Sequence, residues 1–196
     1  MLWDQDVPKM IIEALRTSRL QSSGPAVIDF RSAAVLAPLF FTDEWNFLYT
    51  RRADSLEFHK GEVSFPGGGK EIYDKDLIAT SLRETHEELG IEPNKIHLLG
   101  TLPEIPSKSK YIVTPVVGVL DWPVVISANT TEVSRVFSIP LKWLMDESNW
   151  SEREIILDDG IKISTVIYNK FDGETLWGLT ARITLSIINL IKKGER

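Results

Sequence analysis

The sequence predicts an α/β fold, an α/β/α sandwich around a mixed central sheet. Three observations support this prediction: amphipathic helical patterns at residues 7–20, 76–89 and 178–192, strand-like apolar segments between them, and a nearly continuous apolar run at residues 112–120. A helix that is apolar on one side buries that side against another layer. The apolar run indicates a strand covered on both faces, so helices are expected on both sides of the sheet.

The first part of the chain places a helix before a pair of strands. Apolar residues recur at helical spacing within residues 7–20, and a polar break follows them. Residues 33–41 and 45–49 are apolar and flank a turn-prone Thr-Asp-Glu segment, which indicates two strands. Residues 51–60 are polar, and we expect them to form a loop.

The central helix is expected over residues 76–89. Asp74 or Asp76 is available to cap its start, and Gly90 follows its end as a glycine often does. Further strands are predicted at residues 96–102 and 112–120, and the second should be buried on both faces.

The remaining elements are shorter, apart from the last helix. They are a mobile-looking loop at 103–110, a short strand at 124–126, one helical turn at 141–145, a hairpin of 155–157 with 161–168, and a C-terminal helix at 178–192. The Asp-Gly step inside that hairpin favours a tight turn.

Composition limits the class of protein. The chain has 196 residues, most simply one domain, and its 43% hydrophobic and 26% charged content is ordinary for a globular protein. Its net charge of −6 argues against nucleic acid as the main partner, and no apolar run is long enough to span a bilayer. Cysteine is absent, which excludes thiolate chemistry and fits the cytoplasm. We expect neither a membrane nor a nucleic-acid partner, and a homodimer is the assembly to test.

Three glutamates gather on one side of the helix predicted at residues 76–89. Residues three and four apart are neighbours on a helix, so Glu84, Glu87 and Glu88 project together. Like charges at these spacings repel, and a bound divalent cation with its preference for oxygen ligands would remove the repulsion. A metal site is one interpretation, and a solvated acidic surface is the other.

A loop rich in glycine precedes this helix. Residues 65–71 read Phe-Pro-Gly-Gly-Gly-Lys-Glu, and consecutive glycines let the backbone approach a ligand closely. A glycine run followed by a helix with a carboxylate face closely resembles the Nudix box of the Nudix hydrolases. Residues 83–90, Arg-Glu-Thr-His-Glu-Glu-Leu-Gly, match the end of that box at every fixed position.

One position departs from the usual box. Lys75 occupies the place of the intermediate acidic residue, and Asp74 lies one position earlier. This spacing resembles the coenzyme A diphosphatase branch of the family. Residues 48–68 also follow that branch's upstream pattern of Leu-Thr-x-Arg, then Leu, His, Gly and Phe-Pro-Gly-Gly. The resemblance returns at residues 114–118 and 177–181.

The resemblance implies a single Nudix hydrolase domain over residues 1–196, with residues 1–30 as an N-terminal helical extension. It also implies metal-dependent hydrolysis of the diphosphate of coenzyme A or its derivatives, giving 4′-phosphopantetheine and adenosine 3′,5′-bisphosphate. A Nudix hydrolase of another nucleoside diphosphate derivative, such as NADH or ADP-ribose, is the alternative within the same chemistry. A nucleotide-binding module that has lost catalysis is the alternative from another class.

By the same resemblance, Glu84, Glu87 and Glu88 would hold Mg²⁺ or Mn²⁺, and the Gly67 carbonyl is a further candidate ligand. Metal ions can clamp phosphate oxygens and lower the pKa of a bound water. Glu84 is also a candidate general base, and Glu132, which follows a polar loop, is the second candidate. Glu132 could instead be a solvated loop residue.

The arginines and the glycine turn supply the remaining candidates. Arg83 precedes Glu87 by one helical turn, so an ion pair can hold that carboxylate in place without touching the substrate. A planar guanidinium suits phosphate oxygens. Candidate substrate contacts next to the glycine run, each with ordinary surface charge or loop support as its alternative, are Arg51, Arg52, His59, Lys60 and Gly68.

Overall fold

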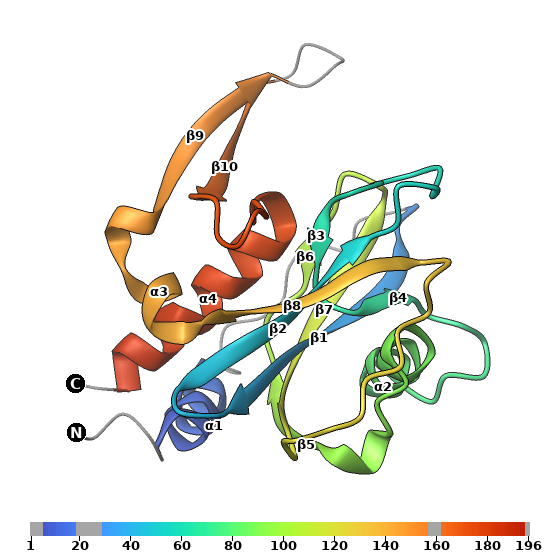
Figure 1. Cartoon of the computed structure of the whole chain (residues 1–196), viewed down its shortest axis with the longest axis horizontal. Helices are drawn as coiled ribbons and strands as arrows, with labels where there is room; N and C mark the ends of the chain where they lie inside the picture. The colour runs from blue at the N-terminus through green and yellow to red at the C-terminus, as the bar shows by residue number, and fades with distance from the viewer. Residues whose placement is uncertain (1–5, 19–28, 157–161, 195–196) are drawn as a thin grey trace.

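The computed structural model describes residues 6–18, 29–156 and 162–194. A mixed sheet forms the middle layer of this structure (Figure 1). Its strands are β1 (Arg31–Phe41), β2 (Trp45–Arg52), β3 (Val63–Ser64), β4 (Gly67–Gly69), β5 (Ile96–Thr101), β6 (Ile105–Pro106), β7 (Tyr111–Leu120) and β8 (Val133–Pro140). β1 runs parallel to β7, and the other pairs in the sheet are antiparallel.

Helices cover both faces of this sheet, which confirms the predicted α/β/α sandwich (Figure 1). The helix α2 (Leu77–Leu89) lies on one face, and α1 (Val7–Ser18) packs with α4 (Gly178–Gly194) on the other. A short helix, α3 (Leu141–Met145), follows β8. Single 3₁₀ turns occupy Pro93–Lys95 and Glu147–Asn149.

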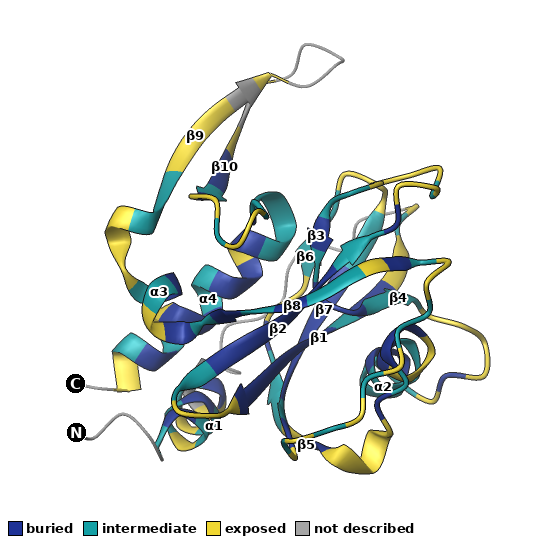
Figure 2. Cartoon of the chain, in the orientation of Figure 1, coloured by how far each residue is buried: buried dark blue, intermediate teal, exposed yellow. Residues whose placement is uncertain are grey.

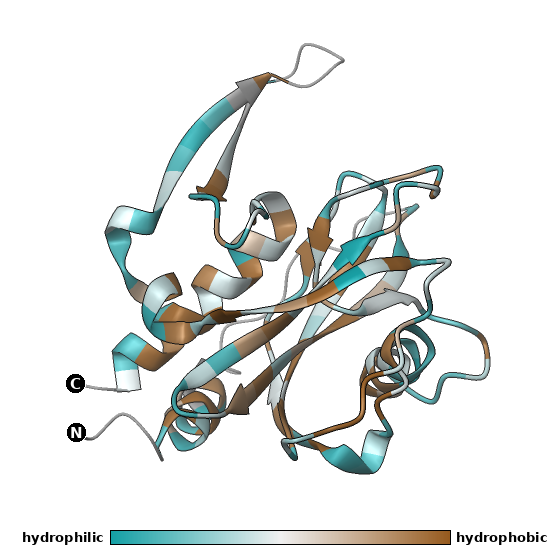
Figure 3. Ribbon diagram, in the orientation of Figure 1, coloured by the Kyte–Doolittle hydropathy of each residue, from teal (hydrophilic) through white to brown (hydrophobic). Residues whose placement is uncertain are grey.

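Two apolar cores follow from this layering, because successive strand residues point to opposite faces. Phe47 and Tyr49 of β2 face the α1/α4 side, whereas Leu48 faces α2. The apolar positions and the buried positions coincide along the sheet interior (Figures 2 and 3). The predicted burial of residues 112–120 on both faces is confirmed, since Val116 and Val117 are both fully buried.

The N-terminal end of α4 is tied to the sheet by polar contacts. The hydroxyls of Tyr49 and Thr184 hydrogen-bond at 3.0 Å, and the Thr180 hydroxyl donates to the Val63 carbonyl at 3.2 Å. Burial raises the pKa of the Tyr49 phenol well above its usual value, so this contact stays neutral. The helix therefore starts beside β3, the strand that leads into the glycine run.

One predicted strand is wrong. Residues 124–126 form no strand: Val124 and Ile126 pack on the α2 core, while Val125 between them is 86% exposed. The segment comes after β7 in the chain and packs beside the C-terminal end of α2, where the Ser127 N–H donates to the Leu89 carbonyl at 2.8 Å. The residue that follows the segment therefore hydrogen-bonds to a helix end and not to a neighbouring strand.

The other differences concern boundaries. β2 extends through Arg52, so the predicted loop at 51–60 begins two residues later, and β6 lies inside the loop predicted at 103–110. Residues 132–137, given no element in the sequence analysis, contribute most of β8. Residues 19 and 20 of the first predicted helix and the hairpin turn at 157–161 lie outside the described residues. That residues 1–196 form one domain stays a prediction.

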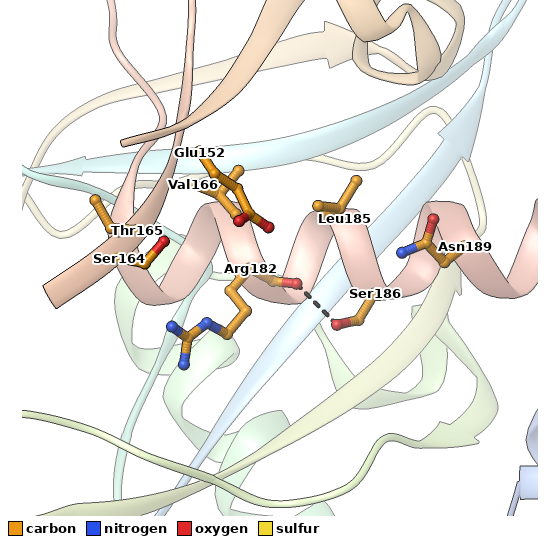
Figure 4. Close-up of a pocket in the computed structure, with 8 residues that line it drawn as sticks. All are labelled: Glu152, Ser164, Thr165, Val166, Arg182, Leu185, Ser186 and Asn189. Atoms are coloured by element: carbon orange, nitrogen blue, oxygen red, sulfur yellow. Dashed lines mark hydrogen bonds between the residues drawn. The ribbon is translucent and has the colours of Figure 1, made fainter. Parts of the chain in front are cut away.

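The predicted hairpin is present as β9 (Trp150–Ile156) paired with β10 (Lys162–Tyr168). It projects beside α4 (Figure 1). A polar cavity of about 170 Å³ separates the two and is lined by Glu152, Ser164, Thr165, Val166, Arg182, Leu185, Ser186 and Asn189 (Figure 4). None of the candidate site residues lines it. Among the described residues, none of the helices has the length and apolarity needed to cross a membrane.

Candidate active site

Local capping fixes the rotation of α2 and therefore the directions of its glutamates. Asp76 caps the helix: its side chain accepts a hydrogen bond from the Ala79 N–H at 2.8 Å. Gly90 ends the helix in a left-handed conformation with φ of 67°, and its N–H donates to the His86 carbonyl at 2.8 Å. Of the two capping candidates, Asp76 is the one used.

The glycine run forms the strand β4 and lies directly against α2. Gly67 has φ of 157°, and a Cβ there would lie 2.6 Å from the Val35 Cα. A Cβ at Gly68 would lie 2.6 Å from the carboxylate of Glu84. Backbone atoms therefore exclude a side chain at Gly67, and the Glu84 carboxylate lies directly against the backbone of Gly68.

Asp74 and Arg83 form a buried ion pair that links the loop to the helix. The Asp74 carboxylate accepts hydrogen bonds from Arg83 Nε at 2.9 Å and Nη2 at 3.0 Å, from the Glu71 N–H at 2.9 Å and from the Thr80 hydroxyl at 3.0 Å. The hydrogen bonds from Arg83 hold the pKa of the Asp74 carboxyl well below its usual range. Asp74 therefore fixes the guanidinium, a role that the sequence analysis did not assign to it.

Arg83 in turn organises the glutamates and the glycine run. Its Nη1 lies 2.9 Å from Glu84 Oε1 and 2.8 Å from Glu87 Oε2, and its Nη2 donates to the Gly69 carbonyl at 3.0 Å. The predicted contact between Arg83 and Glu87 is present. The same guanidinium also contacts Glu84, so Arg83 links two glutamates of α2 to the backbone of β4.

Glu88 differs from its two neighbours because it is buried and incompletely bonded. Its residue is 4% exposed, and its Oε2 atom has no hydrogen-bond partner among the described residues. Burial raises the pKa of the Glu88 carboxyl to about 8, although the charge of Arg52 and the Gly67 N–H oppose this shift. A buried carboxylate oxygen with no partner costs free energy, so its retention needs an explanation.

Glu132 joins this group from another part of the chain. Its charge raises the pKa of both Glu84 and Glu88, although burial is the main cause in each case. The loop that carries it is fixed to the end of α2, because the Asn129 N–H donates to the Glu88 carbonyl at 2.8 Å. The Asn129 side chain also donates to Glu132 Oε1 at 3.0 Å.

The donor set suits a hard cation, although it is not preassembled. In the part of the chain that the structure describes, no three acidic or histidine side chains converge closely enough to hold one ion. Glu84 and Glu87 contact Arg83 instead. The unpartnered oxygen of Glu88 and the all-oxygen chemistry of the three glutamates nevertheless fit Mg²⁺ or Mn²⁺, provided that Glu84 and Glu87 turn away from Arg83.

The two arginines of β2 point to opposite faces of the sheet. Arg51 is held by Asp54, with two hydrogen bonds of 2.9 and 3.2 Å, by the Ser134 hydroxyl at 3.0 Å and by Glu174 at 3.7 Å. Arg52 acts electrostatically on Glu88, and its buried Nε has no partner among the described residues.

The remaining candidates lie on the loop between β2 and β3. His59 is hydrogen-bonded through Nε2 to the Ser109 hydroxyl at 2.6 Å and through Nδ1 to Glu62 at 3.1 Å. Lys60 is exposed and makes no ion pair within the described ranges. The structure thus joins His59 to another loop, and it leaves the roles of both residues as predictions.

The fold and the loop–helix site together define a class of protein. Residues 30–158 match the NUDIX domain family. The chain belongs to the Nudix hydrolase family, whose members act on phosphorus-containing anhydrides.

One relative and two solved structures are similar to this chain. It is 40% identical over 153 residues to the protein named "Uncharacterized Nudix hydrolase NudL" of Yersinia pestis (strain Pestoides F), covering 78% of this chain and 76% of the relative. The MutT/nudix family protein from Enterococcus faecalis has a TM-score of 0.57 at 15% identity and covers 98% of this chain and 76% of its own. The Nudix hydrolase from Alicyclobacillus acidocaldarius has a TM-score of 0.55 at 15% identity, with coverages of 84% and 93%. These structural likenesses show the fold.

Proposed function

We propose that this Nudix hydrolase cleaves the diphosphate bond of coenzyme A or a derivative, giving 4′-phosphopantetheine and adenosine 3′,5′-bisphosphate. The observation that most supports a diphosphate site is the buried, unpartnered oxygen of Glu88 beside a strand made only of glycines. The branch pattern in residues 48–68 supports coenzyme A over other nucleoside diphosphate derivatives. We also place the reaction in the cytoplasm.

Glu84, Glu87 and Glu88 are assigned as the metal ligands, with the Gly67 carbonyl as a further donor. A bound Mg²⁺ or Mn²⁺ would neutralise the charge of the diphosphate and lower the pKa of the attacking water. Arg83 holds Glu84 and Glu87 on its own side of the helix until a metal draws them away, and Glu84 already lies against the backbone of Gly68. Hydrolysis of this kind depends on position and electrostatics more than on covalent chemistry by the protein.

The proton acceptor is assigned to one of two carboxylates. Glu84 lies against the glycine strand and is half-buried, so it can act as ligand and base. Glu132 is close enough to Glu84 and Glu88 to raise their pKa values, and it does not lie on the metal-binding helix. A base on a separate loop leaves the helix carboxylates free for the metal.

Substrate contacts are assigned to Arg52, His59, Lys60 and Gly68, with Arg51 as a weaker candidate. Arg52 is favoured because its unpartnered Nε lies on the same side of the sheet as Glu88. Arg51 already has three partners on other elements. An arginine that is free to donate suits a phosphate oxygen better than one that is already paired.

The test is product analysis after incubation of coenzyme A with the protein and Mg²⁺ or Mn²⁺. We expect 4′-phosphopantetheine and adenosine 3′,5′-bisphosphate in equal amounts, and no reaction in excess EDTA. NADH and ADP-ribose are assayed in parallel. Equal kcat/KM on all three substrates would remove the preference for coenzyme A, and cleavage of none would favour a non-catalytic binding module.

A further inference from the structure

The turn at residues 107–111 connects β6 to β7 and is fixed by its own hydrogen bonds. The Ser107 N–H donates to the Tyr111 carbonyl at 2.8 Å, and the Tyr111 N–H donates to the Ser107 hydroxyl at 3.1 Å. Lys110 has a left-handed φ of 59°, a backbone conformation that residues other than glycine rarely adopt. The turn thus presents Lys108 and Ser109 in a defined shape, both exposed.

A second loop docks on this turn through His59. The His59 ring bridges Ser109 on the turn, at 2.6 Å, and Glu62 on its own loop, at 3.1 Å. His59 also has a left-handed φ, of 54°. Two side-chain-bearing residues in this conformation therefore lie on loops that touch, and such backbone strain is concentrated at ligand-binding positions.

A lysine of the turn at residues 107–111 also lies close to an aromatic ring. Lys108 Nζ lies 5.9 Å from the centre of the Trp177 ring, and Trp177 precedes α4. Lys60, Lys108 and Lys110 make no ion pairs within the described part of the chain, although the whole protein carries a net charge of −6. Unpaired lysines gathered on an acidic protein favour an anionic ligand.

The glycine strand β4 lies between the turn at residues 107–111 and the carboxylates of α2. Gly68 faces Glu84 on one side of the sheet, whereas the position of a Cβ on Gly69 lies 3.7 Å from the Tyr111 ring on the other. A molecule lying over β4 would meet only backbone atoms from the strand itself. Among the described strands β4 pairs only with β1, so no strand blocks its other edge, and a ligand with its diphosphate near Glu84 can pass that edge toward the turn that ends at Tyr111.

We propose that Lys108 and Trp177 bind the adenosine 3′-phosphate end of the substrate, with Trp177 stacking on the base and Lys108 contacting the 3′-phosphate. The proposal rests on the proposed function, because it takes the substrate to be a coenzyme A derivative. An aromatic face stacks on any base. A lysine ammonium forms strong, charge-assisted hydrogen bonds to phosphate. The surface would thus distinguish a substrate with a 3′-phosphate from one without it.

The test compares coenzyme A with dephospho-coenzyme A, which has the same diphosphate but lacks the 3′-phosphate. For Lys108→Gln we expect kcat/KM on coenzyme A to fall about tenfold, mainly through KM, the scale of one charged hydrogen bond. On dephospho-coenzyme A the change should stay within about twofold. Lys108→Arg should restore most of the loss. Trp177→Leu should weaken the binding of both substrates, because both carry the adenine base that stacks on this ring.

Lys193→Gln is the matched control, because Lys193 is exposed near the other end of α4 and makes no ion pair in the described ranges. It should leave both substrates unchanged. An equal loss on both substrates for Lys108→Gln, or no loss on either, would overturn the subsite while leaving coenzyme A hydrolysis intact. If the wild-type enzyme cleaves neither compound, the proposed function fails and the subsite fails with it.

Discussion

Two buried carboxylates at opposite ends of α2 have opposite surroundings. Asp74, just before the helix, accepts four hydrogen bonds, and these hold its pKa low. Glu88, in the last turn, keeps an oxygen without a partner among the described residues, and burial raises its pKa to about 8. The comparison separates stability from function: a fully bonded charge holds the loop to the helix, whereas an incompletely bonded one is available to a ligand.

Replacement of Glu88 tests this contrast most directly. Glu88→Gln should lower kcat/KM on the diphosphate substrate about a thousandfold, the scale of removing one electrostatic stabiliser from an active site. Its free energy of unfolding in EDTA should not fall, because burial already raises the pKa of this carboxyl to about 8, and glutamine replaces it with a neutral group of the same shape. Activity assays and urea unfolding measure the two effects.

Glu92→Gln is the matched control, since Glu92 is an exposed glutamate just beyond the same helix. It should change neither quantity. If Glu88→Gln lost several kcal/mol of stability and kept its activity, Glu88 would belong with Asp74 as a structural residue.

Replacement of Asp74 should have the opposite pattern. Asp74→Ala leaves the Arg83 guanidinium without its main partner, so we expect the free energy of unfolding to fall by about 3–5 kcal/mol. Asp54→Ala, which removes the solvent-screened ion pair of Asp54 with Arg51, should lower the free energy of unfolding much less. Urea unfolding at pH 7 measures both changes. Equal losses of stability would show that the Asp74 ion pair contributes no more than an exposed one.

The pH dependence of stability gives a second readout of Asp74. Its folded-state pKa is lower than its unfolded-state pKa, so the folded protein binds fewer protons than the unfolded chain in acid. The stability from this group is complete above about pH 4 and is lost as the pH falls further. Asp74→Ala should therefore lose less stability than the wild type on acidification below pH 4.

Replacement of Glu132 sharpens the contrast on the catalytic side. Glu132→Gln should lower kcat about a hundredfold with little change in stability, the usual scale for loss of a general base. The pH–rate profile should lose its acidic limb if Glu132 is the base. A full rate with an unchanged profile would leave Glu84 as the remaining candidate.

The two arginines of β2 repeat the comparison at a smaller scale. Arg52→Gln should lower kcat/KM about tenfold, because its guanidinium acts on Glu88 and its Nε has no partner among the described residues. Arg51→Gln should leave kcat/KM within about twofold and lower the free energy of unfolding only slightly, because solvent screens its ion pairs. The reverse outcome would return the phosphate contact to Arg51.

Local sequence patterns were sufficient to predict α2, the glycine that ends it and the order of the sandwich layers. The phase of the helix follows from residues three and four apart, so the contact of Arg83 with Glu87 could be predicted, whereas its contact with Glu84, the next residue along the chain, could not. The apolar run at residues 124–126 misled the prediction, because an apolar run does not specify a partner strand. The burial of Glu88 could not be predicted either, since the loop at residues 129–132 is what helps to cover that end of the helix.

The sequence by itself determined the family, the sandwich and the three glutamates on one helix, because these depend on local periodicity and on a contiguous motif. Only the tertiary structure decided that Asp76 caps the helix while Asp74 clamps Arg83, that Arg52 and not Arg51 faces Glu88, and that Glu132 joins the carboxylates. Those outcomes depend on contacts between segments far apart in the chain. Burial and electrostatic fields are set by such contacts and leave no local pattern to read.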